Sequence, residues 1–270
     1  MKIIKPYAKM LPPAGNFLDS DDFTPADGIN LLEHIEWCAR ISHRSEDAVT
    51  NESWKRIIQA VVLDHGDWSV VEHASVSVDA YVDRGITHEW VRHRLFSYTQ
   101  ESTRFVNYEK KMRPSFIYPD PKVECIWCLQ GKQDETVPAE VFFDQGSKSW
   151  QHTILLSDGK THKLDACRYH PQWLFGIEAV EVAYKQLIAN KWAPQLARSV
   201  FPNALASRII VTGNLRNWRH FFIMRTSKET HPQMKQVTIP LLKEFQEKIP
   251  MLFDDIVPEQ KQSEAMKKAR

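Results

Sequence analysis

Residues 74–83 read ASVSVDAYVD, and this stretch carries the clearest structural signal in the chain. Small and β-branched apolar side chains alternate with mostly polar ones, which places Val76, Val78, Ala80 and Val82 on one face. A period of two residues is typical of a strand with one buried face and one face open to water. The stretch therefore predicts a half-buried β-strand.

Helical periodicity surrounds this strand on both sides. Apolar residues recur at helical spacing over 29–41 and 51–64, and Asn51 is the expected N-cap of the second helix. The later pattern predicts a helix from Arg84 to about Ser97, an extended segment at 103–108, helices at 171–191, 214–225 and 232–249, and a strand at 205–212. Helices that flank a few separated strands indicate the α+β class, with helices packed around a mostly antiparallel sheet.

The region 109–170 differs from the rest of the chain, because it has many prolines and no sustained periodicity. Within it, Asp158-Gly159 between two short apolar or alternating runs predicts a β-hairpin. We interpret the region as an inserted hairpin with loops in a single domain that spans residues 1–270. The lysine-rich end, 255–270, is expected to fray.

The composition is that of an ordinary globular protein. The 270 residues are 43% hydrophobic and 26% charged, and the formal net charge is +1. A balance so close to neutral argues against a partner such as nucleic acid or a membrane surface. No apolar run of about 18 residues predicts a transmembrane helix, and the N-terminus does not resemble a signal peptide. The four cysteines do not suggest a disulfide scaffold, so a reducing, cytoplasmic setting is expected.

The segment RHRLFSYTQESTR, from Arg92 to Arg104, concentrates positive charge locally. Three arginines and one histidine face a single acidic side chain, Glu101. Fixed positive charge is unfavourable in a folded interior unless an anion meets it. Because arginine binds phosphate and carboxylate groups in a bidentate manner, the segment predicts a site for a phosphorylated small molecule. A nucleic-acid-binding module would use the same arginines, but the near-neutral charge disfavours it.

Four motifs, in order along the chain, resemble those of the flavin-dependent thymidylate synthases. Arg92-His93-Arg94, followed by seven residues and Ser102, is similar to the RHR-x7-S signature of that family. The others are EHAS (72–75), LARSVFP (196–202, with phenylalanine in place of the usual leucine) and TGNLRNWRHFFIMR (212–225). A single short motif can occur by chance, whereas four motifs in the same order rarely occur together by chance. The matches cover most of residues 30–245 outside 109–170.

The resemblance implies an enzyme that methylates deoxyuridine monophosphate (dUMP) to thymidine monophosphate (dTMP). Methylenetetrahydrofolate would supply the carbon and FAD, reduced by NADPH, the hydride. A homotetramer with active sites shared between subunits is also implied. The implied dUMP-binding residues are Glu89, Arg92, Gln100, Glu101, Ser102, Thr103, Arg104, Arg198 and Arg225. The implied FAD-binding residues are His73, Ser75, Arg92, His93, Arg94, Gln100, Asn214, Leu215, Arg216 and His220.

The resemblance gives the catalytic role to Arg225. It would contact the uracil ring and favour its ionisation, since a cation beside the ring stabilises developing negative charge. The alternative is a solvated residue on an apolar helix face. Ser102 has no paired base beside it in the sequence, so we assign it to binding and not to covalent attack. None of the four cysteines follows a proline, which argues against the cysteine mechanism of other thymidylate synthases.

Several alternatives stay open. His73 and His220 fit structural roles as well as flavin contacts. Cys125 and Cys128 have the spacing of zinc ligands, but the later candidates fit no standard pattern, so no metal is predicted; these are His162, Cys167 and His170. A related one-carbon transfer with a different product would use the same pocket.

Two departures from the family pattern concern substrate binding. Glu89 stands where members often have glutamine, and its carboxylate would repel a phosphate group unless it pairs with an arginine. Asp67 stands where members often have histidine.

Overall fold

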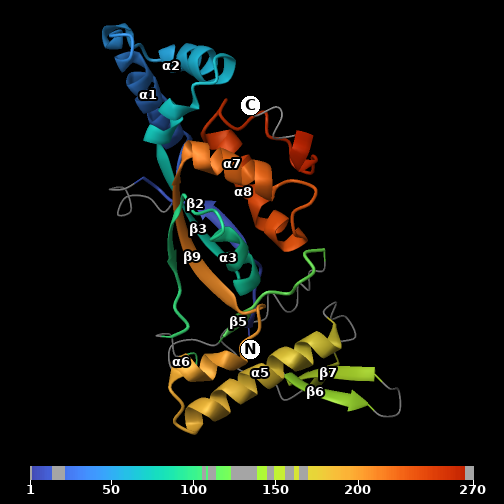
Figure 1. Cartoon of the computed structure of the whole chain (residues 1–270). Helices are drawn as coiled ribbons and strands as arrows, with labels where there is room; N and C mark the ends of the chain where they lie inside the picture. The colour runs from blue at the N-terminus through green and yellow to red at the C-terminus, as the bar shows by residue number, and fades with distance from the viewer. Residues whose placement is uncertain are drawn as a thin grey trace. The chain divides into compact units, whose positions relative to one another are not determined.

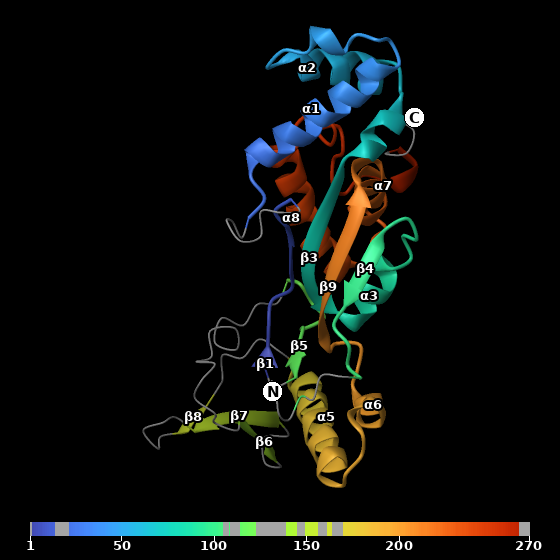
Figure 2. The same cartoon turned by 90° about the vertical axis from the view of Figure 1, so that its left-hand side faces the viewer.

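The structure is a computed structural model that describes residues 2–13, 22–104, 108, 114–122, 139–144, 149–155, 161–163 and 170–264. The chain forms two compact units, whose elements are labelled in Figures 1 and 2. The smaller unit comprises Met1–Lys5, Asp83–Gly85 and Glu101–Ala206, and the larger unit comprises Pro6–Val82, Ile86–Gln100 and Ser207–Arg270. A single domain with an insertion at 109–170 stays a prediction.

A four-stranded sheet forms the centre of the larger unit. Its order is β2 (Tyr7–Met10), β3 (Ser75–Asp83), β9 (Ala206–Asn214) and β4 (Ser97–Gln100). β2 runs antiparallel to β3, and β4 runs antiparallel to β9. Figure 2 shows β3 and β9 side by side as the two long strands. Helices and antiparallel strands together confirm the α+β class.

The alternation in β3 is confirmed by its burial. Val76, Val78, Ala80 and Val82 are at most 2% exposed and belong to the main core of the larger unit. Asp79, which the alternation placed on the polar face, is also buried, because Arg208 of β9 donates to its two carboxylate oxygens at 2.8 Å each. A neighbouring strand therefore supplies the cation that this buried carboxylate requires.

The first helix, α1, is longer than its periodicity predicts. It spans Pro25–Ile41 and not 29–41. Thr24 and Asp27 form a capping box, and Pro25 occupies the first turn, where its missing N–H is not needed. The capping residues therefore start the helix before the apolar stripe begins.

The second predicted helix is divided into two parts. α2 (Ser53–Ile57) is followed by the π-helix η2 (Ile58–Asp64), where a single regular helix was expected. The predicted N-cap at Asn51 was wrong, because Thr50 and Ser53 bond to each other across Asn51 and the helix begins only at Ser53.

The helix that follows β3 is shorter than predicted. α3 spans Arg84–Trp90, so the prediction of a helix to about Ser97 was wrong over its second half. The chain turns after Trp90 and then pairs with β9 through β4. The extended segment expected at 103–108 was also wrong over its described part, since Thr103 and Arg104 lie in a turn.

Two later helices of the larger unit agree with their predictions. They are α7 (Leu215–Arg225) and α8 (Pro232–Lys248), which lie along one face of the sheet in Figure 1. The indole nitrogen of Trp218 on α7 donates to the carbonyl of Val76 on β3 at 3.0 Å. α8 also approaches α1 so closely that a Cβ on Gly28 would overlap the Lys248 carbonyl. No described helix is long and apolar enough to cross a membrane.

The described residues of the smaller unit form two sheets and the helix predicted at 171–191. β1 (Lys2–Ile3) pairs with β5 (Ser115–Phe116), and β6 (Ala139–Asp144), β7 (Ser149–Leu155) and β8 (Thr161–Lys163) form an antiparallel sheet. The predicted hairpin is confirmed by the pairing of β7 with β8, although Asp158-Gly159 lies outside the described residues. Its described helices include α5 (Pro171–Ala189) and α6 (Pro194–Ala197), the latter continued by η4 (Arg198–Val200).

Part of the C-terminal tail contacts the larger unit among the described residues, and fraying over 255–270 stays a prediction. Ile256 is 4% exposed and lies in the main core. The amide of Glu259 donates to the carbonyl of Thr226, and that of Lys228 donates to the carbonyl of Gln260, both at 2.9 Å. These backbone bonds, which composition does not predict, attach the tail to the end of α7.

Candidate active site

The Arg92-His93-Arg94 motif lies in the turn between α3 and β4. The amide of His93 donates to the carbonyl of Trp90 at 3.0 Å. The Tyr98 hydroxyl lies 2.9 Å from the Trp90 carbonyl and 2.7 Å from the His93 carbonyl, so one hydroxyl holds two points of the turn. Burial raises the pKa of Tyr98 to about 12, and the hydroxyl keeps its proton at neutral pH. Arg92 and Arg94 are exposed in this turn, whereas His93 is partly buried.

Aromatic rings support the turn from inside. Phe96 packs edge-on against Trp218, with ring centroids 4.8 Å apart, and the His93 ring lies edge-on to Phe221 at 4.9 Å. Gly213 at the end of β9 makes this packing possible. A Cβ on Gly213 would lie 3.2 Å from Cγ of Phe96 and closer still to two other ring carbons. The glycine of the TGN segment is therefore required for steric reasons.

Arg225, the last residue of α7, is the centre of the site. Its Nε donates to Nε2 of His93 at 2.9 Å, its Nη1 to the Glu89 carboxylate at 3.0 Å, and its Nη2 to the Glu89 carbonyl at 3.1 Å. The Arg225 side chain is only 20% exposed. It is therefore not the solvated helix residue of the alternative interpretation. Glu89 has the arginine partner that its departure from the family pattern required.

The environment of His93 disfavours a positive charge on its ring. Burial, the charge of Arg225 and the nearby His220 lower the pKa of His93 to about 4, in that order of importance. The imidazole is therefore neutral at neutral pH. Arg225 then carries the formal positive charge of the pair, and the Glu89 carboxylate balances it.

The N-terminal end of α7 carries further residues that were predicted to bind the flavin. Asn214 is the N-cap, and its side-chain oxygen accepts from the amide of Asn217 at 2.8 Å. Arg216 pairs with Glu72 of η3 (Trp68–His73). The remaining predicted flavin residues near these elements are exposed: His73, Ser75 and His220.

Two predicted flavin residues have structural partners. Leu215 is fully buried, and its amide donates to the carbonyl of Ala74 at 2.9 Å, so its side chain does not face a ligand. The amide nitrogen of Gln100 donates to the hydroxyl oxygens of Thr87 at 3.1 Å and Ser207 at 3.0 Å. Gln100 therefore fixes β4 against β9 and α3 within the larger unit.

The nucleotide-loop residues form a separate cluster in the smaller unit. Arg198 donates to the hydroxyl of Thr103 at 2.9 Å, and Thr103 is 5% exposed. The Ser102 hydroxyl oxygen accepts from the amide of Arg104 at 3.3 Å, and Glu101 accepts from the hydroxyl of Tyr108 at 3.3 Å. The assignment of Ser102 to binding stays a prediction.

Sequence reasoning missed two residues that shape the site. Tyr98 lies among the seven residues between Arg94 and Ser102, which were treated as a spacer. The sequence feature that could have identified Tyr98 is the alternation of the aromatic residues Phe96 and Tyr98 in and just before the segment that forms β4. Gly213 was counted only as part of a motif, although glycine inside a strand indicates a close approach of other atoms.

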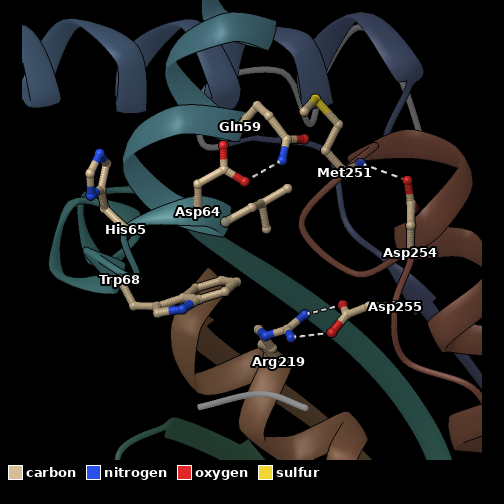
Figure 3. A pocket seen from close by; sticks show the side chains of 10 residues that line it. Gln59, Asp64, His65, Trp68, Arg219, Met251, Asp254 and Asp255 are labelled. Carbon is tan, nitrogen blue, oxygen red and sulfur yellow. Dashed lines mark hydrogen bonds and ion pairs between the residues drawn. The ribbon is translucent and has the colours of Figure 1, made fainter.

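A separate cleft in the larger unit is lined by none of the predicted residues. Its volume is about 470 Å³, and Figure 3 shows its lining residues. Arg219 forms two bonds to the Asp255 carboxylate, at 2.6 and 2.5 Å, and lies over the Trp68 ring. Asp64 accepts from Gln59 at 2.8 Å. These polar groups already have partners, so the cleft is not the candidate active site.

The described residues contain no group of three or more His, Cys, Asp or Glu side chains that could hold a metal ion. Cys125, Cys128 and Cys167 lie outside the described residues, so the zinc alternative stays open.

The sequence that forms this fold and the motif-bearing turn matches a known protein family. Residues 30–251 match the family model described as thymidylate synthase complementing protein. The chain belongs to this family.

Curated relatives agree with this membership. A flavin-dependent thymidylate synthase of Mycobacterium sp. (strain KMS) is 35% identical over 240 residues, which cover 86% of this chain and 82% of the relative. Proteins of the same name from Corynebacterium efficiens and Mycobacterium avium (strain 104) are each 30% identical. They cover 90% and 94% of this chain, and 84% and 92% of their own lengths, respectively.

Proposed function

We propose that the protein is a flavin-dependent thymidylate synthase that converts dUMP to dTMP, with methylenetetrahydrofolate as the carbon donor and NADPH as the reductant of bound FAD. The observation that carries the proposal is the contact between Arg225 and His93, which are 132 positions apart in the sequence. This contact joins the late Arg225 motif to the RHR motif in one site.

The donor set of the larger unit fits a flavin nucleotide. Arg92 and Arg94 are exposed, and neither side chain has an ion pair among the described residues, so both are available to phosphate oxygens. Arg216 in the first turn of α7 and His220 in the middle of the helix are also exposed, and helix N-termini favour anions. When bound, the reduced flavin supplies the hydride of the reaction. In this proposal Asn214, His73 and Ser75 border the same ligand.

The smaller-unit cluster is proposed to bind the nucleotide. Arg198 and Arg104 offer guanidinium groups for the phosphate, and Ser102 and Thr103 offer hydroxyls. Thr103 orients Arg198 by accepting from its Nη1. Glu101 and Gln100 border this loop in the sequence and are proposed to contact the nucleotide beside it. The same proposal includes a homotetramer with shared sites, which a measurement of molecular mass in solution tests.

Arg225 is proposed to act on the uracil ring. Three of its five N–H groups are used by Glu89 and His93, which leaves two donors for a ligand. Held in a partly buried place, a guanidinium stabilises negative charge that develops on the ring more strongly than it would in water. The Glu89 carbonyl and carboxylate fix the direction of the guanidinium plane, so that little reorganisation is required.

The test is to incubate the purified protein with dUMP, methylenetetrahydrofolate and NADPH and to identify the product by mass. We expect dTMP, and we expect the protein to release FAD on denaturation. Arg225→Lys should lower the rate about 100-fold, as expected for loss of a preorganised charge contact. The matched control is Arg56→Lys, a change at an exposed arginine of α2, which should leave the rate unchanged.

Two results would contradict the proposal. A protein that binds FAD but forms no dTMP is not a thymidylate synthase, and a product of different mass would identify another one-carbon transfer. We further propose a cytoplasmic location, supported by the absence of a disulfide-scaffold pattern and by the need for NADPH.

A further inference from the structure

We propose that Arg225 has a second role, as the positioning residue that fixes the His93 ring in the tautomer with its proton on Nδ1, so that His93 presents an Nδ1–H donor to the ligand of the RHR turn. This inference rests on the proposed function for the identity of that ligand, a flavin. The tautomer itself follows from contacts inside the larger unit.

The direction of one hydrogen bond determines the tautomer. Arg225 Nε lies 2.9 Å from His93 Nε2, and an arginine N–H has no lone pair with which to accept. Nε2 must therefore be the unprotonated nitrogen. A neutral imidazole carries one ring proton, so that proton lies on Nδ1. Nδ1 has no partner among the described residues, and it is the only donor atom that the neutral ring offers.

The direction of this bond is secured by Glu89. Its carboxylate and its carbonyl accept from Nη1 and Nη2 of Arg225 at 3.0 and 3.1 Å. With both terminal nitrogens held on one residue of α3, Nε has a fixed direction toward His93. Rotation of the Arg225 guanidinium would break two bonds at once.

The rings around His93 limit its other orientations. Phe221 lies edge-on at 4.9 Å and Phe96 at 6.3 Å between ring centroids. The titratable groups near the ring are Arg225 and His220 of α7, with Glu89 acting through Arg225. Burial, the charge of Arg225 and the nearby His220 lower the pKa of His93, which agrees with a neutral ring. A neutral donor suits a carbonyl oxygen or ring nitrogen of a flavin, while the exposed Arg92 and Arg94 suit its phosphates.

The first test compares two substitutions of His93. The amide nitrogen of asparagine can replace an Nδ1–H donor, whereas the amide oxygen of glutamine can replace the Nε2 acceptor but leaves no donor near Nδ1. We expect His93→Asn to bind FAD within about threefold of the wild type and His93→Gln to bind about tenfold more weakly, since one hydrogen bond is lost. The reverse order of affinities would overturn the proposal. His88→Asn and His88→Gln, at an exposed histidine of α3, should give equal affinities.

The second test reads the tautomer without any flavin. Long-range proton–nitrogen NMR of ¹⁵N-histidine-labelled protein distinguishes Nδ1–H from Nε2–H rings, and loss of one signal set in His93→Gln assigns His93. We expect the Nδ1–H pattern at pH 7 and a mixture of tautomers in Arg225→Met. An Nε2–H ring or a doubly protonated ring in the wild type would disprove the inference. If the wild type binds no FAD, the proposed function fails, and this NMR experiment alone decides the tautomer.

Discussion

Gly213→Ala is the substitution whose effect the structure determines most directly. The backbone at Gly213 does not have the positive φ that favours glycine, so alanine is acceptable there except for its Cβ. Without a clash, replacing glycine with alanine stabilises a protein by about 0.4–1 kcal/mol through the unfolded state. The Cβ, however, would lie 3.2 Å from Phe96 Cγ and nearer to two other ring carbons. Ordinary contacts between carbon atoms are about 3.5–4.0 Å.

The Phe96 ring must therefore move, and its surroundings give it little room. It packs against Trp218 at 4.8 Å and lies 6.1 Å from Phe221 between ring centroids, within the main core. Overpacking of this kind costs about 1–3 kcal/mol. After subtraction of the entropic gain, we expect the free energy of unfolding to fall by about 0.5–2 kcal/mol. Because the Phe96 amide donates to the His93 carbonyl at 3.3 Å, FAD affinity should fall as well.

Urea unfolding followed by tryptophan fluorescence measures the change in stability, and FAD titration measures the change in affinity. The matched control is Gly176→Ala in the middle of α5, where a Cβ meets nothing within 4 Å. That substitution should stabilise by up to about 1 kcal/mol, so the same chemical change has opposite signs at the two positions. Phe96→Leu should recover part of the loss in the Gly213→Ala protein. A Gly213→Ala protein as stable as the wild type would refute the steric reasoning.

Three further predictions concern other contacts of the larger unit. Asp255→Asn should lower the free energy of unfolding by about 1–2 kcal/mol in thermal melts, because buried Arg219 loses its charged partner while Asp255 itself is 44% exposed. Tyr98→Phe should weaken FAD binding. In the wild type, the free energy of unfolding should fall as the pH rises from 10 to about 12, because Tyr98 ionises in the unfolded chain but not in the folded protein; Tyr98→Phe should remove this loss. The free energy of unfolding of the wild type should also fall as the pH drops from 6.5 to about 4, because His93 binds a proton in the unfolded chain but stays neutral in the folded protein. His93→Asn should reduce this dependence.

Each of these has an outcome that contradicts it. Asp22→Asn, which alters an exposed ion pair with Lys9 at 3.6 Å, should leave the free energy of unfolding nearly unchanged. If Asp22→Asn lowered it as much as Asp255→Asn does, the burial of Arg219 would not explain the effect of Asp255→Asn. If stability still fell between pH 10 and about 12 in Tyr98→Phe, Tyr98 would not be the group responsible for that loss. An unchanged acid profile in His93→Asn would show that His93 does not titrate below its ordinary range.

The sequence by itself determined those features that depend on local patterns. Alternation in 74–83 predicted β3 and its buried face, and apolar spacing predicted α7, α8 and α5. The RHR motif and its ordered companions led to the family. These features depend on residues that are close together in the sequence, so sequence patterns predict them directly.

Only the tertiary structure decided where the RHR turn begins and what surrounds its histidine. The turn after Trp90 brings the Tyr98 hydroxyl within hydrogen-bond distance of the Trp90 and His93 carbonyls, and β4 pairs with β9. The meeting of Glu89, His93 and Arg225 also depends on α7 packing against the sheet. Hydrogen bonds across such sequence distances leave no periodic signal, since each partner's pattern is set by its own helix or strand. The sequence therefore supplied the charged groups, and the fold determined which of them pair with each other.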